Sequence, residues 1–299
     1  MDRSEIWSMG ADTIKAFFPV YRLALQAVLR ASGIEKEWII LFHVRGSEPE
    51  PFTSARLLRL WPYTSEQTRI NSLQVLLNKD FITSTDDHYY RLTAQGYRAS
   101  DHIIRMVQRE LGKSRLMNSV DSKYLASLLW RLVQAVHHIN EPSDKLAFRS
   151  NRWTDLGVNA PPITRIDQYL TDLGRFRDDC HFEAWQQHQI EGYIWDALTA
   201  VWRGEAFTAS ALATTLAYRG ISTETYVTAL DRLIELGWVE NDGKPGLVRI
   251  THEGCIIRQQ AESRTNTLFF APWSVLSSAE ITDMQDILTH LLTTLKQIR

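Results

Sequence analysis

The stretch TSEQTRINSLQVLLNKDFITSTDDHYYRLTAQG, residues 64–96, decides the fold that the rest of the chain follows. It opens with Thr64 and with Gln67 three residues later, which is the spacing of a capping box at a helix start. Apolar residues follow at helical spacing, and two short β-prone runs then flank a polar turn at residues 85–88. Thr93 precedes the start of another helix. The predicted order is helix, strand, turn, strand and helix.

A second copy of this plan lies at residues 222–254, with the sequence STETYVTALDRLIELGWVENDGKPGLVRITHEG. The apolar positions align at one constant offset, and the ends of the two copies align after one inserted residue. The aligned positions are Leu73, Leu76, Leu77, Phe81, Ile82, Arg91, Thr93 and Gly96 with Leu230, Leu233, Ile234, Trp238, Val239, Arg249, Thr251 and Gly254. A repeat of this length fixes the architecture, so the sequence predicts two winged-helix units in tandem.

The length and the composition of the chain agree with two units. At 299 residues the chain has room for two domains of ~150 residues each, and 44% hydrophobic and 23% charged residues are ordinary for a globular protein. No run approaches the ~18 apolar residues that span a bilayer, and the N-terminus has no signal-peptide pattern. Cys180 and Cys255 lie far apart without metal-ligand spacing, which favours free thiols in a reducing compartment. We therefore expect a cytoplasmic protein with no membrane partner.

Long helical patterns flank each copy. They cover residues 11–31, 121–139, 163–189 and 278–298, and Pro19 is expected to kink or split the first of them. Three prolines and Gly157 in residues 140–162 indicate an irregular connection. The predicted domains are an N-terminal half at 1–139, a connector at 140–162 and a C-terminal half at 163–299.

The endings RLTAQG (residues 91–96) and RITHEG (residues 249–254) resemble the junction after the wing in MarR-type winged helix-turn-helix transcriptional regulators. The resemblance covers most of both halves and leaves out residues 140–162. It implies a mainly α (α+β) fold in which two tandem winged-helix units and their long flanking helices form a pseudo-two-fold single-chain dimer. It also implies a small apolar effector between the long helices and the winged units. MarR-type proteins usually carry one winged unit and dimerise, whereas this chain supplies two unequal units.

In such a fold the second helix of each helix-turn-helix enters the major groove of double-stranded DNA. The outward face of the first copy is expected to present Gln67, Thr68 and Asn71, because Gln and Asn can bond adenine and Thr can touch a thymine methyl. Arg69 lies at the margin of that face, within reach of a phosphate. The alternative reading is an ordinary solvated helix face. The helices at 64–78 and 222–236 should lie about one DNA turn apart, ~34 Å.

The second copy offers a different face for DNA. Its expected contacts are Thr225, Thr228 and Arg232 on the helix, Tyr226 at its margin, and Lys244 and Arg249 on the wing. Glu224 on the same face repels phosphate unless it accepts from a cytosine amino group. Asp86 and Asp87 at the first wing tip, together with a net charge of −2, also oppose DNA binding. Because the two faces differ, the preferred site should not be a palindrome.

The sequence gives only weak signals for catalysis, metal binding or ligand binding. The sequence contains no glycine-rich phosphate loop, nucleophile elbow or HExxH motif, so we expect no enzyme, catalytic residue or cofactor. His181 and His188 share a helix face without a second ligand pair, which favours a solvated patch over a metal site. The ten tryptophans fit a core between the halves or an apolar ligand pocket. The competing function is a protein-interaction or ligand-binding module that no longer binds DNA, and further association of chains is left open.

Overall fold

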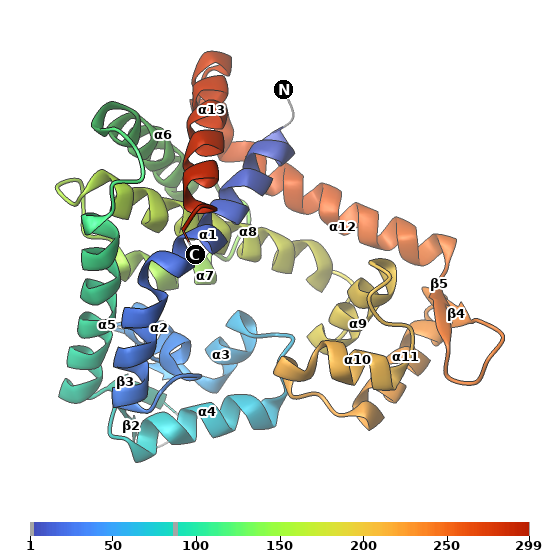
Figure 1. Cartoon of the computed structure of the whole chain (residues 1–299). Helices are drawn as coiled ribbons and strands as arrows, with labels where there is room; N and C mark the ends of the chain where they lie inside the picture. The colour runs from blue at the N-terminus through green and yellow to red at the C-terminus, as the bar shows by residue number, and fades with distance from the viewer. Residues whose placement is uncertain (1–2, 86–88, 299) are drawn as a thin grey trace.

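The structure, a computed structural model, describes residues 3–85 and 89–298, and most of these residues are helical (Figure 1). The elements of the first half are α1 (Arg3–Ser32), α2 (Trp38–Ser47), β1 (Phe52–Thr53), α3 (Ser54–Leu60), α4 (Glu66–Asn78), β2 (Ile82–Thr85), β3 (Tyr89–Leu92), α5 (Ala94–Lys113) and α6 (Ser119–His138). A short connector holds α7 (Leu146–Asn151) and η1 (Arg152–Thr154). The mainly α fold that the sequence predicted is confirmed.

The second half has a similar order, without a strand in the place of β1 and with two additional 3₁₀ helices. Its elements are α8 (Pro162–Gln186), α9 (Gly192–Trp202), α10 (Ala209–Thr215), η2 (Ala217–Arg219), α11 (Thr223–Glu235), β4 (Val239–Asn241), β5 (Val248–Ile250), α12 (His252–Phe270), η3 (Ala271–Val275) and α13 (Ser278–Leu295). We call α2 to α5 the first winged unit and α9 to α12 the second winged unit. No helix of the described residues has the length and apolar character that a membrane crossing requires.

The buried apolar residues form three clusters. The largest joins α1, α6, α8, α13 and the ends of α5 and α12, with Phe17, Leu132, Phe176 and Leu291 fully buried in it. Each winged unit has a smaller cluster of its own. In Figure 1 the long helices lie at the top, the first winged unit at the lower left and the second at the lower right. Each winged unit therefore has a core of its own beside the core of the long helices.

The wing of each unit is a small antiparallel sheet. In the first unit β3 lies between β1 and β2, with Phe52 opposite Tyr90. In the second unit β4 pairs with β5, and the place of β1 is taken by one hydrogen bond from the Val248 nitrogen to the Phe207 oxygen (2.9 Å). Residues 86–88, and with them the acidic side chains Asp86 and Asp87 expected at the first wing tip, lie outside the described residues.

The junction between the first wing and α5 depends on Thr93 and Gly96. The Thr93 hydroxyl accepts from the Gly96 nitrogen (3.1 Å) and donates to the Asp80 oxygen, while the Thr93 nitrogen donates to the Phe81 oxygen (3.1 Å). A Cβ on residue 96 would lie 2.0 Å from the Phe81 oxygen. Only glycine fits this close approach of two main chains.

The second wing is joined to α12 in the same way. The Thr251 hydroxyl accepts from the Gly254 nitrogen (3.0 Å) and donates to the Gly237 oxygen (2.7 Å), and the Thr251 nitrogen donates to the Trp238 oxygen (3.1 Å). A Cβ on residue 254 would lie 2.1 Å from that Trp238 oxygen. The aligned endings RLTAQG and RITHEG thus make matching hydrogen bonds.

Two local expectations need correction. The cap of α4 is Ser65, not Thr64, because the Ser65 hydroxyl accepts from the Thr68 nitrogen at 3.1 Å. Pro19 lies inside a continuous α1 and does not split it. The connector packs on the rest of the protein through Phe148 on α7, which is fully buried. The buried Asp179 carboxylate accepts from two consecutive main-chain nitrogens of α7 and anchors it to α8.

Candidate nucleic-acid interface

The exposed side of α4, which we call the α4 face, consists of Gln67, Ile70, Asn71, Gln74 and Asn78. Gln67 donates to Asn71 and Gln74 donates to Asn78, each at 2.8 Å between the amide groups. Ile70 is 47% exposed, although it follows the helical spacing of the apolar residues of α4. The α4 face therefore offers four neutral amides and one branched aliphatic side chain.

Thr68 and Arg69, which were expected to face DNA, are engaged within the protein. The Thr68 hydroxyl accepts from the Ser65 hydroxyl at 2.8 Å. The Arg69 guanidinium donates to the main-chain oxygens of Thr64 and Trp61, and partial burial lowers its pKa. Both side chains therefore shape the start of α4, and Gln67 and Asn71 remain on the exposed side.

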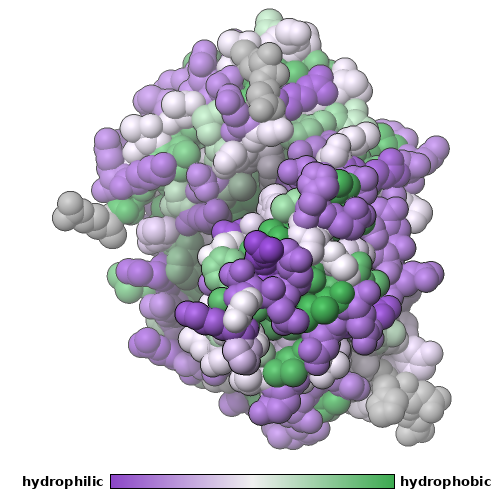
Figure 2. All heavy atoms as spheres, turned by 90° about the vertical axis from the view of Figure 1, so that its right-hand side faces the viewer, coloured by the Kyte–Doolittle hydropathy of each residue, from purple (hydrophilic) through white to green (hydrophobic). Residues whose placement is uncertain are grey.

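The α11 face holds the aligned positions Glu224, Val227, Thr228, Asp231 and Glu235, all exposed. Val227 is 48% exposed, and Ile70, at the aligned position of α4, is 47% exposed. The four amides of the α4 face are thus replaced by three carboxylates and a hydroxyl. Figure 2 views the side of the second unit, where hydrophilic side chains cover most of the surface.

The remaining residues of α11 that were predicted to contact DNA differ in their exposure to solvent. Arg232 is exposed and forms an ion pair with Glu235 at 2.9 Å. Thr225 is half-buried, and its nitrogen donates to the Ser222 hydroxyl that caps the helix. Tyr226 was expected at the margin of the outward face, but it is fully buried in the core of the second unit. Tyr226 cannot touch DNA in this position, because the helix turns it toward α9 and not toward solvent.

The basic side chains around the two helices are mostly paired with acids. Arg249 on β5 lies 2.9 Å from Glu240 and 3.8 Å from Asp242. On the first unit, Arg56 pairs with Glu50. Lys244 is exposed in the turn between β4 and β5. A pairing of this kind leaves little unbalanced positive charge for phosphates.

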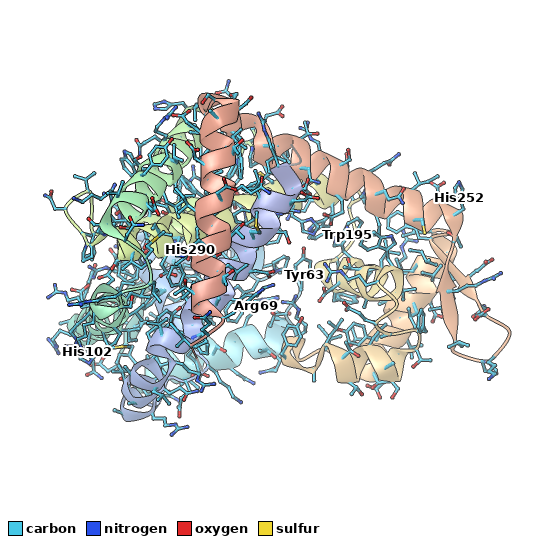
Figure 3. The ribbon with its side chains drawn as sticks, turned by 45° about the horizontal axis from the view of Figure 1, so that its top comes forward. Tyr63, Arg69, His102, Trp195, His252 and His290 are labelled. Carbon is cyan, nitrogen blue, oxygen red and sulfur yellow. The ribbon has the colours of Figure 1, made fainter. Side chains whose placement is uncertain are left out.

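The two helix-turn-helix turns contact each other directly, and we call this contact the seam. The Ser65 nitrogen donates to the Arg219 oxygen at 2.8 Å. A Cβ on Gly220 would lie 2.1 Å from the Thr68 hydroxyl oxygen, so the main chain of one unit touches the recognition helix of the other. The Arg219 guanidinium also stacks over the Tyr63 ring at 5.0 Å. In Figure 3 Tyr63 and Arg69 lie beside this boundary, with Trp195 on the side of the second unit.

The seam corrects the expected spacing of the recognition helices. Only two residues separate Gly220 from the start of α11, so the first turns of α4 and α11 lie no more than about 20 Å apart. The starts of the two helices are therefore closer together than the ~34 Å expected between the helices as a whole. Both starts line one groove of about 630 Å³, to which Gln67, Arg69 and Thr225 contribute. Sequence analysis missed the seam, although Gly220 marked a turn there.

Two further cavities lie between the long helices and the winged units. One of about 150 Å³ beside the first unit has aromatic and aliphatic walls that include Tyr21, Trp38 and Phe42, with His43 and Asp167 among its polar groups. Burial lowers the pKa of His43 to about 3 and raises that of Asp167 to about 7. These shifts favour neutral side chains in the cavity.

A larger cavity of about 460 Å³ lies beside the second unit. Its lining includes Arg175, Arg177 and Arg203, together with the carboxylates Asp178 and Glu262. Arg175 pairs with Asp178 at 3.2 Å and Arg177 pairs with Glu262 at 3.6 Å. Arg175 lines both cavities, so each of them contains a guanidinium group.

The histidines that were considered as metal ligands are packed against other groups. His181 contacts the Thr265 hydroxyl at 3.4 Å, and the His188 ring stacks on Trp195 with centroids 5.7 Å apart. Within residues 3–85 and 89–298, no three His, Cys, Asp or Glu side chains gather as a set of metal ligands. Cys180 and Cys255 are both free thiols.

Comparison with known proteins gives one match. The model of a helix-turn-helix family matches residues 94–297, which include α5, all of the second winged unit and most of the remaining long helices. Neither a curated protein nor a solved structure matches the chain. The matched region begins after α4, so the family similarity rests on the second unit and the helices around it.

Proposed function

We propose, since the chain belongs to a helix-turn-helix family, that it is a DNA-binding transcriptional regulator. The observation that carries the proposal is the α4 face, where exposed amides and an aliphatic side chain lie beside a single exposed carboxylate, Glu66. Amides of this kind bond adenine, and an aliphatic group suits a thymine methyl. A regulator of this kind works in the cytoplasm beside the DNA, and the proposal assigns it no enzymatic activity.

The finer proposal is a MarR-type arrangement duplicated within one chain. The repeated element order and the matching bonds of Thr93 and Thr251 support a duplication. The long helices would then take the place of a dimer interface, as a pseudo-two-fold single-chain dimer. Because the α4 and α11 faces differ in charge, such a regulator would read an asymmetric site.

The two faces contribute unequally in this proposal. Gln67 and Asn71 contact base edges in the major groove, and Lys244 contacts the phosphate backbone from the second wing. Thr225, Thr228 and Arg232 share their helix with three carboxylates, so their contribution is smaller. The cavity beside Trp38 and Phe42 is the proposed place for a small apolar effector, because aromatic and aliphatic side chains form half of its lining, beside polar groups that include Asp167 and Arg175.

The deciding experiment is selection from a randomised double-stranded DNA library at low and at moderate salt. A regulator enriches a non-palindromic sequence, and its affinity falls as salt rises because bound cations are released from the phosphates. Replacing Lys244 by Ala should weaken binding uniformly and reduce the salt slope by about 1. Lys123, exposed on α6 away from both winged units, is the control, and its replacement should change neither quantity.

A second candidate function is a protein-interaction or ligand-binding module that no longer binds DNA. The carboxylates Glu224, Asp231 and Glu235 on α11 favour it, because they repel phosphate at the place where a recognition helix meets DNA. The same selection separates the two functions. If no sequence is enriched even at low salt, the regulator is excluded and the interaction module stands.

A further inference from the structure

We propose that base reading belongs to the α4 face alone, and that it selects one A·T-rich block of DNA. This inference rests on the proposed function and adds which unit reads and which base pairs it prefers. Its first support is chemical. The α4 face presents Gln67, Asn71, Gln74 and Asn78, and amides of Gln and Asn can bond adenine N6 and N7 together.

Ile70 supplies the complementary contact. It is 47% exposed, lines a surface cavity with Leu58 and Leu73, and lies one turn after Glu66 and one turn before Gln74. In the major groove the C5-methyl of thymine is the feature that an apolar side chain can recognise. Adenine-bonding amides around a methyl-binding side chain therefore match A·T base pairs, while guanine calls for the cation that this face lacks.

The α11 face has the opposite character. Glu224, Asp231 and Glu235 occupy the positions of Gln67, Gln74 and Asn78, so the substitutions add three negative charges to a helix of the same shape. Arg232 offsets one of them through its ion pair with Glu235. Carboxylates close to the phosphate backbone weaken the electrostatic attraction on which all DNA binding depends.

The seam adds a geometric reason. The starts of α4 and α11 meet through Ser65 and Arg219 and lie no more than about 20 Å apart, whereas successive major grooves on one side of DNA are ~34 Å apart. With the seam closed, the first turns of both helices cannot enter successive grooves. The helix-turn-helix shape of the second unit, to which the family similarity extends, then serves to hold α4 in place.

The length of the block follows from α4 itself. From Gln67 to Asn78 the helix rises about 17 Å, at ~1.5 Å per residue, which covers about 5 base pairs at ~3.4 Å each. Selection with the full chain should therefore return one short A·T-rich block without a second block one turn away. A G·C-rich block, or two blocks about 10 base pairs apart, would overturn the proposal while leaving the regulator itself intact.

Matched substitutions test the same point at aligned positions. Ile70→Ala and Gln74→Ala should each lower affinity for the selected DNA about 5-fold or more and relax the base preference. Val227→Ala and Asp231→Ala, at the aligned positions of α11, should lower the affinity for the same DNA no more than about 2-fold. This limit is well below a tenfold change in affinity, which corresponds to ~1.4 kcal/mol. All four side chains are exposed, and thermal unfolding of each variant verifies that it folds.

The outcomes are distinct. Equal losses from the α4 and α11 variants would show that both faces read bases and would refute one-sided reading. Losses confined to Val227→Ala and Asp231→Ala would reverse the assignment and refute it as well. If the unaltered chain enriches no DNA at all, the proposed function fails first, and this inference falls with it.

Discussion

The main-chain nitrogen of Ser65 donates a hydrogen bond to the carbonyl oxygen of Arg219, at 2.8 Å, across 154 positions of sequence. The bond joins the first residue before α4 to the last residue of η2, so each helix-turn-helix turn is fixed against the other. Arg219 is held on its own side by an ion pair with Asp196 at 2.9 Å. The relative position of the two recognition helices is therefore set by direct contact as well as by the long helices above them.

The seam should be weakened by adding one methyl group. In Gly220→Ala the new Cβ meets the Thr68 hydroxyl oxygen at 2.1 Å, and the positive φ of +67° adds backbone strain. Gly243→Ala is the matched control, because its φ is +69° and nothing lies within 4 Å. We expect Gly243→Ala to cost about 1 kcal/mol of unfolding free energy and Gly220→Ala about 1–3 kcal/mol more. Urea denaturation measures both, and equal losses would show that the seam contributes nothing.

The two wing junctions should be equivalent in energy as well as in geometry. Thr93→Ala and Thr251→Ala each remove a helix cap and a hydrogen bond to the preceding turn. Each should lower the unfolding free energy by about 1–2 kcal/mol, and Thr→Ser, which keeps the hydroxyl, should recover most of it. Thermal or urea unfolding provides the measurement. A large loss at one position and none at the other would contradict the equivalence.

His43 should make the protein less stable in mild acid. Its side chain is 7% exposed, accepts a hydrogen bond from the Trp61 indole at 3.2 Å, and has its pKa lowered to about 3 by burial. The unfolded chain protonates this histidine near pH 6.5, so between pH 6.5 and pH 3 only the unfolded state gains the proton. Stability from this group is complete above pH 6.5 and falls as the pH is lowered.

The variant His43→Gln keeps an acceptor for Trp61 and removes the titration. Relative to this variant, the unaltered protein should lose about 2 kcal/mol of unfolding free energy between pH 7 and pH 5. Burial raises the pKa of Asp172 and Asp179, which act in the opposite sense, but both are present in the two proteins and cancel in the comparison. Urea denaturation at the two pH values gives the difference. A difference that stays constant with pH would contradict the buried, neutral state of His43.

The sequence predicted the helices and wings well because their core positions recur. Leu73 and Leu230 are both buried, as are Leu76 and Leu233, since a helix that packs on one side must repeat its apolar residues every three or four positions. The threonine-to-glycine spacing at each wing junction was equally readable. Those constraints are local, so a pattern of residues close in sequence reveals them.

The candidate site was predicted less well because its geometry depends on distant partners. Nothing in the local pattern distinguishes Tyr226, which is buried, from a residue at the margin of an exposed face. Ile70 fits an apolar stripe, yet the neighbouring α3 leaves it half uncovered beside Leu58. The seam joins residues more than 150 positions apart, and the only local sign of it was a glycine in a turn.

The presence of both winged units in one 299-residue chain has a consequence for how binding depends on concentration. Two separate subunits must first associate, so their binding to DNA weakens when the protein is diluted. Covalent connection replaces that step with a fixed, high effective concentration of each unit beside the other. A regulator built in this way would respond to its own abundance linearly, without the threshold that subunit association imposes.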